Sequence, residues 1–248
     1  MTETTVCYKE EYYEENIKEP SLLVHKVSID PSSIKKITYE QKNNFFTKLG
    51  FLKPKREEID CEAVSLFYEP FHIVKARYHI DFYKKDTYKL KVDERVSEVI
   101  IFGQKLKPES PKKMKKLLKR GSAEIKLPAE DRIIHEATVH IAQDRKGREV
   151  DLRKLPSAPA STEPEKVLAE YDDIVRKPEF SADKLIDSIR KRIVKKPSEA
   201  ERIVEEVFEV SENTVIYTPV YEARYRYLKT GEIKIIPISG VIGKPFYP

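Results

Sequence analysis

The sequence predicts an α+β fold of two related units, each a helix leading into an antiparallel sheet, with a helical and hairpin region between them. Three observations support this: a set of features occurs twice, alternating apolar and polar residues follow each occurrence, and helical apolar spacing precedes each. The 248 residues are 40% hydrophobic and 36% charged. This composition can build a core, which excludes a wholly disordered chain, and it contains no apolar stretch of the roughly 18 to 20 residues that span a bilayer.

The repeated pattern runs from Tyr-x-Pro to Ala-Arg-Tyr and then to a polar break. It occupies residues 68–70 and 76–78 in the first copy, and residues 217–219 and 223–225 in the second. The spacing from Pro to Ala is six residues in the first copy and four in the second. A difference of two residues keeps the same side chains on the same face of a strand. The pattern therefore indicates a duplicated β module.

Alternation predicts which face of each repeated strand is buried. Tyr78 and Tyr225 fall on an apolar face, whereas Arg77, Asp81 and Arg224 fall on the opposite, polar face. Each copy predicts an antiparallel hairpin, because a polar break is followed by a second alternating run. The expected turns are residues 84–87 and 229–231, and the expected return strands are residues 88–93 and 232–238.

Helices are expected before each module. Ser181 can cap a helix whose apolar stripe runs from Leu185 to Val194, and Ser198 with Glu201 forms a capping box for a second helix that reaches Phe208. A shorter helix at residues 39–49, ending at Gly50, is the counterpart in the first copy.

The region between the modules contains a basic helix and a β-hairpin. Ser110-Pro111 and Gly121 bracket the helix, residues 137–141 alternate as a strand, and residues 144–147 form a turn. All seven glycines fall at expected turns or element ends. The predicted divisions are an acidic N-terminal segment (1–38), repeat unit A (39–106), the middle region (107–154), a Pro-rich linker (155–164) and repeat unit B (165–248).

Positive charge is concentrated in one part of the chain. The net charge is +5, yet residues 105–126 carry nine Lys and Arg against two Asp and Glu, while the first twenty residues contain six Glu. Such a segment can seek an acidic protein or a nucleic acid, or it can be a solvated helix face. The candidate binding residues are Lys112, Lys113, Lys115, Lys116, Lys119 and Arg120 on the basic helix, with the repeated Arg77 and Arg224 on strands.

No motif points to catalysis, a metal or a cofactor. The histidines of His135-Glu136-Ala137-Thr138-Val139-His140 are five residues apart, which places them on opposite faces of a strand rather than on one face of a helix. Gly240-Val241-Ile242-Gly243-Lys244 is followed by Pro245, so the helix that a phosphate loop requires cannot follow. Cys61 has no neighbouring His and is expected to be a structural thiol. No catalytic residue, metal ligand or cofactor is therefore assigned.

The second copy resembles a known kind of small β module. Residues 217–227, Gly231 and residues 240–244 are similar to modules appended to varied archaeal and bacterial proteins, with Ile242 where the module usually has Thr. The whole chain also resembles a conserved-hypothetical type of archaeal protein. Neither resemblance implies an activity or a functional residue.

These observations favour a non-enzymatic cytoplasmic interaction or scaffold protein. The alternatives are a nucleic-acid-binding protein that uses the basic helix 111–120 with the strand arginines, and an enzyme whose site forms only in the fold. The polar start of the chain and the two cysteines outside any motif predict a cytoplasmic location. No membrane insertion is expected, because the apolar side of the basic helix is narrow and lacks aromatic anchors. Dense mixed charge also suits a thermophile.

Overall fold

The computed structural model describes residues 13–46, 53–109, 122–179 and 181–247. It is mostly β, with 52% of residues in strands and 20% in helices. The strands form one mixed sheet of seven strands and a separate sheet of two strands. The predicted α+β fold of two helix-plus-sheet units is therefore wrong.

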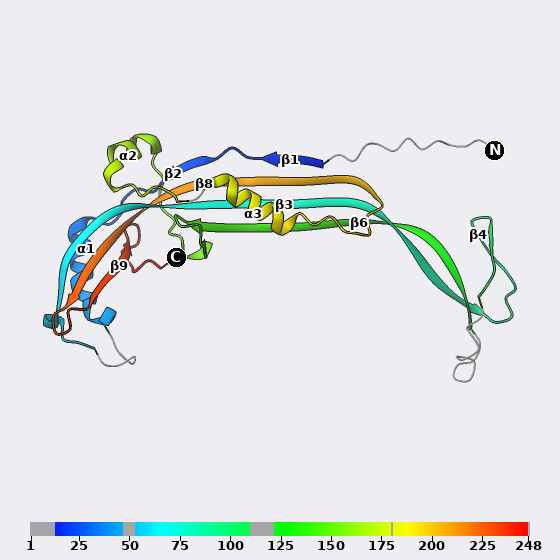
Figure 1. The fold of residues 1–248 in the computed structure, drawn as a ribbon, viewed down its shortest axis with the longest axis horizontal. Helices are drawn as coiled ribbons and strands as arrows, with labels where there is room; N and C mark the ends of the chain where they lie inside the picture. The colour runs from blue at the N-terminus through cyan, green and yellow to red at the C-terminus, as the bar shows by residue number, and fades with distance from the viewer. Residues whose placement is uncertain (1–12, 47–52, 110–121, 180, 248) are drawn as a thin grey trace. The chain divides into compact units, whose positions relative to one another are not determined.

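The strands and helices follow one another in the order shown in Figure 1. The strands are β1 (Tyr13–Ile17), β2 (Ser21–Val24), β3 (Ile59–Asp93), β4 (Val99–Ile101), β5 (Gln104–Leu106), β6 (Ser122–Asp144), β7 (Glu149–Val150), β8 (Arg202–Tyr227) and β9 (Ile233–Ser239). The α-helices of the described residues are α1 (Pro31–Gln41), α2 (Pro164–Glu170) and α3 (Ala182–Ile193). Short 3₁₀ turns occupy Lys42–Phe46, Arg56–Glu58, Leu152–Lys154 and Asp172–Ile174.

Three long strands form the centre of the large sheet, in the order β8, β3, β6, and they lie side by side in Figure 1. The strand β1 pairs with the outer side of β8, and β7 pairs antiparallel with β6. Two further strands pair with β8: β2 runs parallel to it and β9 runs antiparallel to it. The β2 pairing is parallel whereas the β7 and β9 pairings are antiparallel, so the sheet is mixed.

The predicted turn at residues 84–87 does not exist, because β3 continues through it to Asp93. The segment contains no Gly or Pro to set a turn, and Asp86 is its only residue of a turn-forming type. Interactions with other strands hold it extended instead: Lys85 forms an ion pair with Glu201, and the hydroxyl of the following residue, Tyr88, donates to Asp131 over 2.9 Å. Glu201 and Asp131 are remote in the sequence, so the local polar pattern by itself predicts a turn here.

The predicted helix from Ser198 to Phe208 is also wrong. Strand β8 begins at Arg202, and the Glu201 N–H donates to the Tyr83 carbonyl over 2.9 Å. The backbone N–H and C=O groups of the long strand β3 need hydrogen-bond partners on an adjacent strand. This requirement outweighs the local preference for a helix that a capping box provides. Of the predicted helix at residues 39–49, the end (47–49) lies outside the described residues, and the rest falls in the last residues of α1, which starts earlier, and in the 3₁₀ turn after it.

Several local predictions are confirmed. Helix α3 buries Leu185, Ile186 and Ile189, and the β8–β9 hairpin turns at residues 229–231 as expected. The turn at residues 144–147 joins β6 to β7.

The predicted faces of the repeated strands are confirmed as well. Tyr78 and Tyr225 are fully buried, whereas Arg77 and Arg224 are exposed. Asp81 differs from the prediction, because it lies on the polar face and is nevertheless buried.

The chain divides into two units, which are described separately. One unit consists of Met1–Glu14, Tyr78–Ala137 and Lys195–Val207, and the other of Glu15–Arg77, Thr138–Val194 and Phe208–Pro248. Each of β3, β6 and β8 contributes residues to both units.

The second unit contains a core where β8 and β9 pack against α1. Ile34 and Phe46 lie against Tyr225 and Ile238 in this cluster. The Tyr225 hydroxyl donates to the Thr38 carbonyl over 3.2 Å, so the buried phenol is satisfied. The repeated tyrosines are therefore core residues, as the alternation predicts.

Candidate functional site

The first unit contains a hairpin, formed by β4 and β5, whose exposed apolar residues are not explained by packing in the core. The two strands form their own antiparallel sheet, with Ile101 opposite Gln104 and Ile100 opposite Lys105. A loop of two residues, Phe102 and Gly103, therefore joins them. Val99 to Phe102 is a run of four apolar residues at the tip of this hairpin.

Two properties of the tip residue Phe102 are energetically unfavourable: its backbone conformation and the exposure of its ring. Its φ is +47° and that of Gly103 is +78°, as in a type I′ turn, where Asn, Asp or Gly is the usual first residue. Left-handed backbone costs an ordinary L-residue roughly 1–2 kcal/mol. The ring is also fully exposed, at 101% of its reference area, and Ile100 beside it is 61% exposed. Among the described residues, Phe102 is the one residue other than glycine that has a positive φ.

Charged residues around the hairpin are nearly balanced in sign. Glu98 and Lys105 form an ion pair at 3.4 Å on the exposed surface. Residues 93–109 together contain three Lys and Arg against four Asp and Glu. The hairpin therefore presents an apolar tip rather than a cationic surface.

The polar face of β3 in the first unit is neutralised within the sheet. Asp81 is 4% exposed and accepts three hydrogen bonds from Arg132, of which the shortest is 2.6 Å. These bonds hold the pKa of the Asp81 carboxyl below its ordinary value. His79 lies between Glu136, at 3.1 Å, and Glu205, at 3.5 Å. These groups are occupied with one another, so they are not a reactive cluster.

Arg224, one of the two strand arginines singled out in the sequence, is paired with a carboxylate. Its Nε donates to Glu62 over 2.9 Å, and Arg226 binds the other oxygen of the same carboxylate. The two arginines hold the pKa of Glu62 below its ordinary value. Arg77 is exposed on β3 within the same unit. A phosphate group would have to displace Glu62 from Arg224.

The other predicted site residues are outside the described residues. Residues 110–121 include the whole predicted basic helix, and with it Lys112, Lys113, Lys115, Lys116, Lys119 and Arg120. Outside this segment, an antiparallel bridge joins Glu109 to Glu124, and the Glu109 N–H donates to the Glu124 carbonyl over 2.7 Å. A binding role for the six cations stays a prediction.

The histidine and cysteine residues have structural surroundings. His135 and His140 are exposed on β6, as the five-residue spacing predicts for a strand. His72 is fully buried, and its Nε2 lies 2.7 Å from the Asn213 amide oxygen. Burial raises the pKa of the Cys61 thiol, which disfavours a nucleophilic thiolate. Within the described ranges, no three His, Cys, Asp or Glu residues gather as metal ligands.

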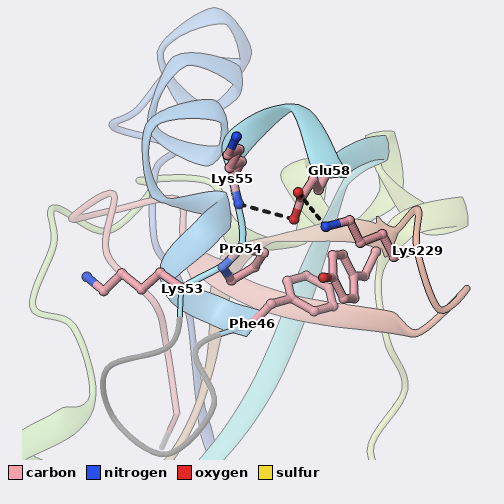
Figure 2. A pocket seen from close by; sticks show the side chains of 7 residues that line it. Phe46, Lys53, Pro54, Lys55, Glu58 and Lys229 are labelled. Carbon is pink, nitrogen blue, oxygen red and sulfur yellow. Dashed lines mark hydrogen bonds and ion pairs between the residues drawn. The ribbon is translucent and has the colours of Figure 1, made fainter.

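The second unit also contains a pocket of about 350 Å³ with an aromatic floor made by Phe46 and Tyr227. Figure 2 shows that the amino groups of Lys53 and Lys55 point away from the Phe46 ring and from each other. Glu58 is held by Lys229 at 2.7 Å, which keeps the pKa of the carboxyl low. The polar groups of this pocket therefore do not converge on a bound molecule, as a built site requires.

The sequence contained only a partial signal for the hairpin tip. Gly103 marks a turn, but the left-handed conformation of the residue before it depends on a two-residue loop between paired strands. A Phe in this position is not predicted by turn propensity. The run Val99–Phe102 beside Gly103 was the available clue.

None of the helices in the described ranges is both long and apolar enough to cross a membrane.

Comparisons with known proteins do not assign the chain to a family. No family model, no curated protein and no solved structure matches it.

Proposed function

We propose that this chain is a non-enzymatic cytoplasmic interaction or scaffold protein, and that it contacts its partner through the β4–β5 hairpin. The proposal is based on Phe102, whose ring is fully exposed and whose backbone is in the left-handed region. Strained backbone conformations cluster at functional sites, so an observed outlier supports a hypothesis of function.

The energetics of the free hairpin support a contact role. A two-stranded hairpin is marginal in water, and the strands here have three residues each. Asn-Gly in the same turn would remove the strain and the exposed ring together. Burial of Phe102 and Ile100 against a partner would remove apolar surface from water, which stabilises the contact by roughly 25 cal/mol for each Å².

The polar strand faces are a weaker candidate surface than the hairpin. Asp81 with Arg132, and Glu62 with Arg224, form internal ion pairs. A partner bound there would first have to break these pairs and then compensate both charges. The apolar tip requires no such exchange.

A nucleic-acid partner is less well supported at the hairpin. Binding to phosphates needs an excess of cations on the contacting surface, and residues 93–109 have one more anion than cations. Binding of a nucleic acid by the cationic run at residues 112–120 is tested separately. Replacement of Lys112, Lys113, Lys115 and Lys116 by Gln would abolish salt-dependent binding to an oligonucleotide if that run binds phosphates.

A single tryptophan at the tip tests the contact, because the natural chain contains no Trp. The Phe102→Trp variant is expected to show the emission of a water-exposed indole when dilute. Its emission should shift to the blue either as protein concentration rises or when extract of the native host is added, because the tip becomes buried in the contact. In the extract, the residue is incorporated as 7-azatryptophan, which can be excited apart from the tryptophans of other proteins.

The matched control is Leu228→Trp, since Leu228 is a 57% exposed apolar residue beside the turn of the β8–β9 hairpin. Its emission should stay unchanged under both conditions. An indole at position 102 that remains water-exposed at high concentration and in extract would refute the hairpin contact. Equal shifts at both positions would refute it as well, because they would indicate nonspecific association.

A further inference from the structure

The β4–β5 hairpin has an open edge along each strand in the described structure, since the two strands form a sheet by themselves. In a hairpin closed by a two-residue loop, the residues that flank the loop exchange hydrogen bonds with each other. These are Ile101 and Gln104. The next pair, Ile100 and Lys105, then directs its N–H and C=O groups outward. Each open edge therefore offers the backbone donor and acceptor of one central residue.

Two copies of one edge can pair with each other about a twofold axis. Antiparallel strands related by such an axis are self-complementary, because the central residue lies opposite its own copy. On the β4 edge, Ile100 would exchange two hydrogen bonds with the second Ile100. Val99 would then lie opposite Ile101 of the other copy.

Charge distinguishes the two edges. The three residues of β4 are Val99, Ile100 and Ile101, none of which is charged. The central residue of β5 is Lys105, so pairing through that edge would place two ammonium groups opposite each other. Like charges directly opposite are destabilising, and an edge lysine is a common protection against pairing. The β4 edge is the one left open for association.

The exposed apolar side chains agree with this choice. Ile100 is 61% exposed and would meet its copy at the axis, where directly opposed side chains contact each other. Phe102 is two residues further along the chain and would flank this pair from either end. β-Branched and aromatic side chains are the types that stabilise cross-strand pairs.

We infer that the hairpin binds a second copy of this chain, edge to edge through β4, with Ile100 of each copy at the twofold axis. This inference rests on the proposed function and names the partner. Three residues per strand bury much less than the roughly 1,200 Å² of a stable interface. The dimer is therefore weak and concentration-dependent, which suits a scaffold that assembles reversibly.

Disulfide trapping tests the register. With Cys7 and Cys61 replaced by Ser, Ile100→Cys places two thiols opposite each other at a Cα separation of about 5.5 Å, within the range that a disulfide spans. Mild oxidation should then give a covalent dimer on a non-reducing gel, with a yield that rises with protein concentration.

The matched control is Gln104→Cys in the same background, on the other strand of the hairpin, because it leaves the Lys105 charge in place. It should cross-link at least tenfold more slowly, because the β5 edge faces away from the axis. Equal rates at both positions, faster trapping at position 104, or no dimer at either position would overturn the inference.

The two proposals fail in distinguishable ways. If Phe102→Trp shifts its emission only with host extract and Ile100→Cys does not dimerise, the hairpin contact stands and the second copy is excluded as the partner. In a second measurement, sedimentation of the wild type should show a mass that rises with concentration. Ile100→Lys should remain monomeric, because two lysines would meet at the axis. An Ile100→Lys variant that associates like the wild type would also overturn the inference.

Discussion

At the scale of single residues, burial and partner determine which charged groups matter. The Asp81 side chain is 6% exposed and is bonded to Arg132, whose own side chain is 54% exposed. A buried carboxylate whose partner is removed retains its desolvation cost. The sequence placed Asp81 on a solvated face, and the long-range partner on β6 explains why it is buried instead.

We therefore expect Arg132→Gln to lower the free energy of unfolding at pH 7, because the buried Asp81 carboxylate loses its partner. Urea denaturation measures the loss, and Arg153→Gln is the control, because the Arg153 side chain is 90% exposed and its change should cost clearly less. An equal loss in the two variants would contradict the role assigned to Asp81.

Acid should remove the difference between the wild type and Arg132→Gln. The pKa of Asp81 is lowered in the folded protein by its bonds to Arg132, so the stability it contributes is present above the unfolded pKa of about 3.9. That contribution is lost as pH falls through the lower folded pKa. The gap between the two unfolding curves should narrow below about pH 4, and a gap that widens there would contradict this linkage.

At the scale of elements, Gly240 fixes the end of the β8–β9 hairpin. Its N–H donates to the Pro219 carbonyl over 2.8 Å, and its carbonyl accepts from Ser28 and Ile29. A Cβ here would lie 3.0 Å from the Pro219 oxygen, which is backbone and cannot move aside cheaply. The glycine-containing segment at residues 240–244 is therefore a structural turn.

Gly240→Ala should lower the free energy of unfolding by about 1–3 kcal/mol, because the hairpin end must shift to admit the methyl group. Gly231→Asn is the comparison: φ is +73° there with nothing near the site, and Asn tolerates this conformation. It should change stability by under about 0.5 kcal/mol in thermal or urea unfolding. A neutral Gly240→Ala would contradict the close packing.

The elements also show what the sequence can predict. Helix α3 is encoded by its own apolar spacing, and the β8–β9 hairpin by Gly231 in its turn, so both were predicted correctly. The continuation of β3 beyond Lys84 depends on Glu201 and Asp131, which are remote in the sequence. Local patterns cannot contain that information, and the helix predicted up to Phe208 failed for the same reason.

At the scale of the whole molecule, the net charge of +5 conceals an uneven distribution. Internal ion pairs occupy the polar strand faces of each unit, while the cationic run at residues 112–120 lies outside the described residues. The sequence correctly indicated buried tyrosines and exposed arginines, yet it directed attention to the charges. The hairpin tip was missed because a strained Phe is recognised only from its backbone conformation.

The central claim is that Phe102 is retained for contact and not for folding. The most direct test compares amide hydrogen exchange at Ile101 and Gln104 in the dilute wild type and in Phe102→Asn, after correction for intrinsic rates. Relief of about 1 kcal/mol of strain should slow exchange in the variant about fivefold. Faster exchange in Phe102→Asn would show that the ring stabilises the free hairpin, and it would contradict the claim.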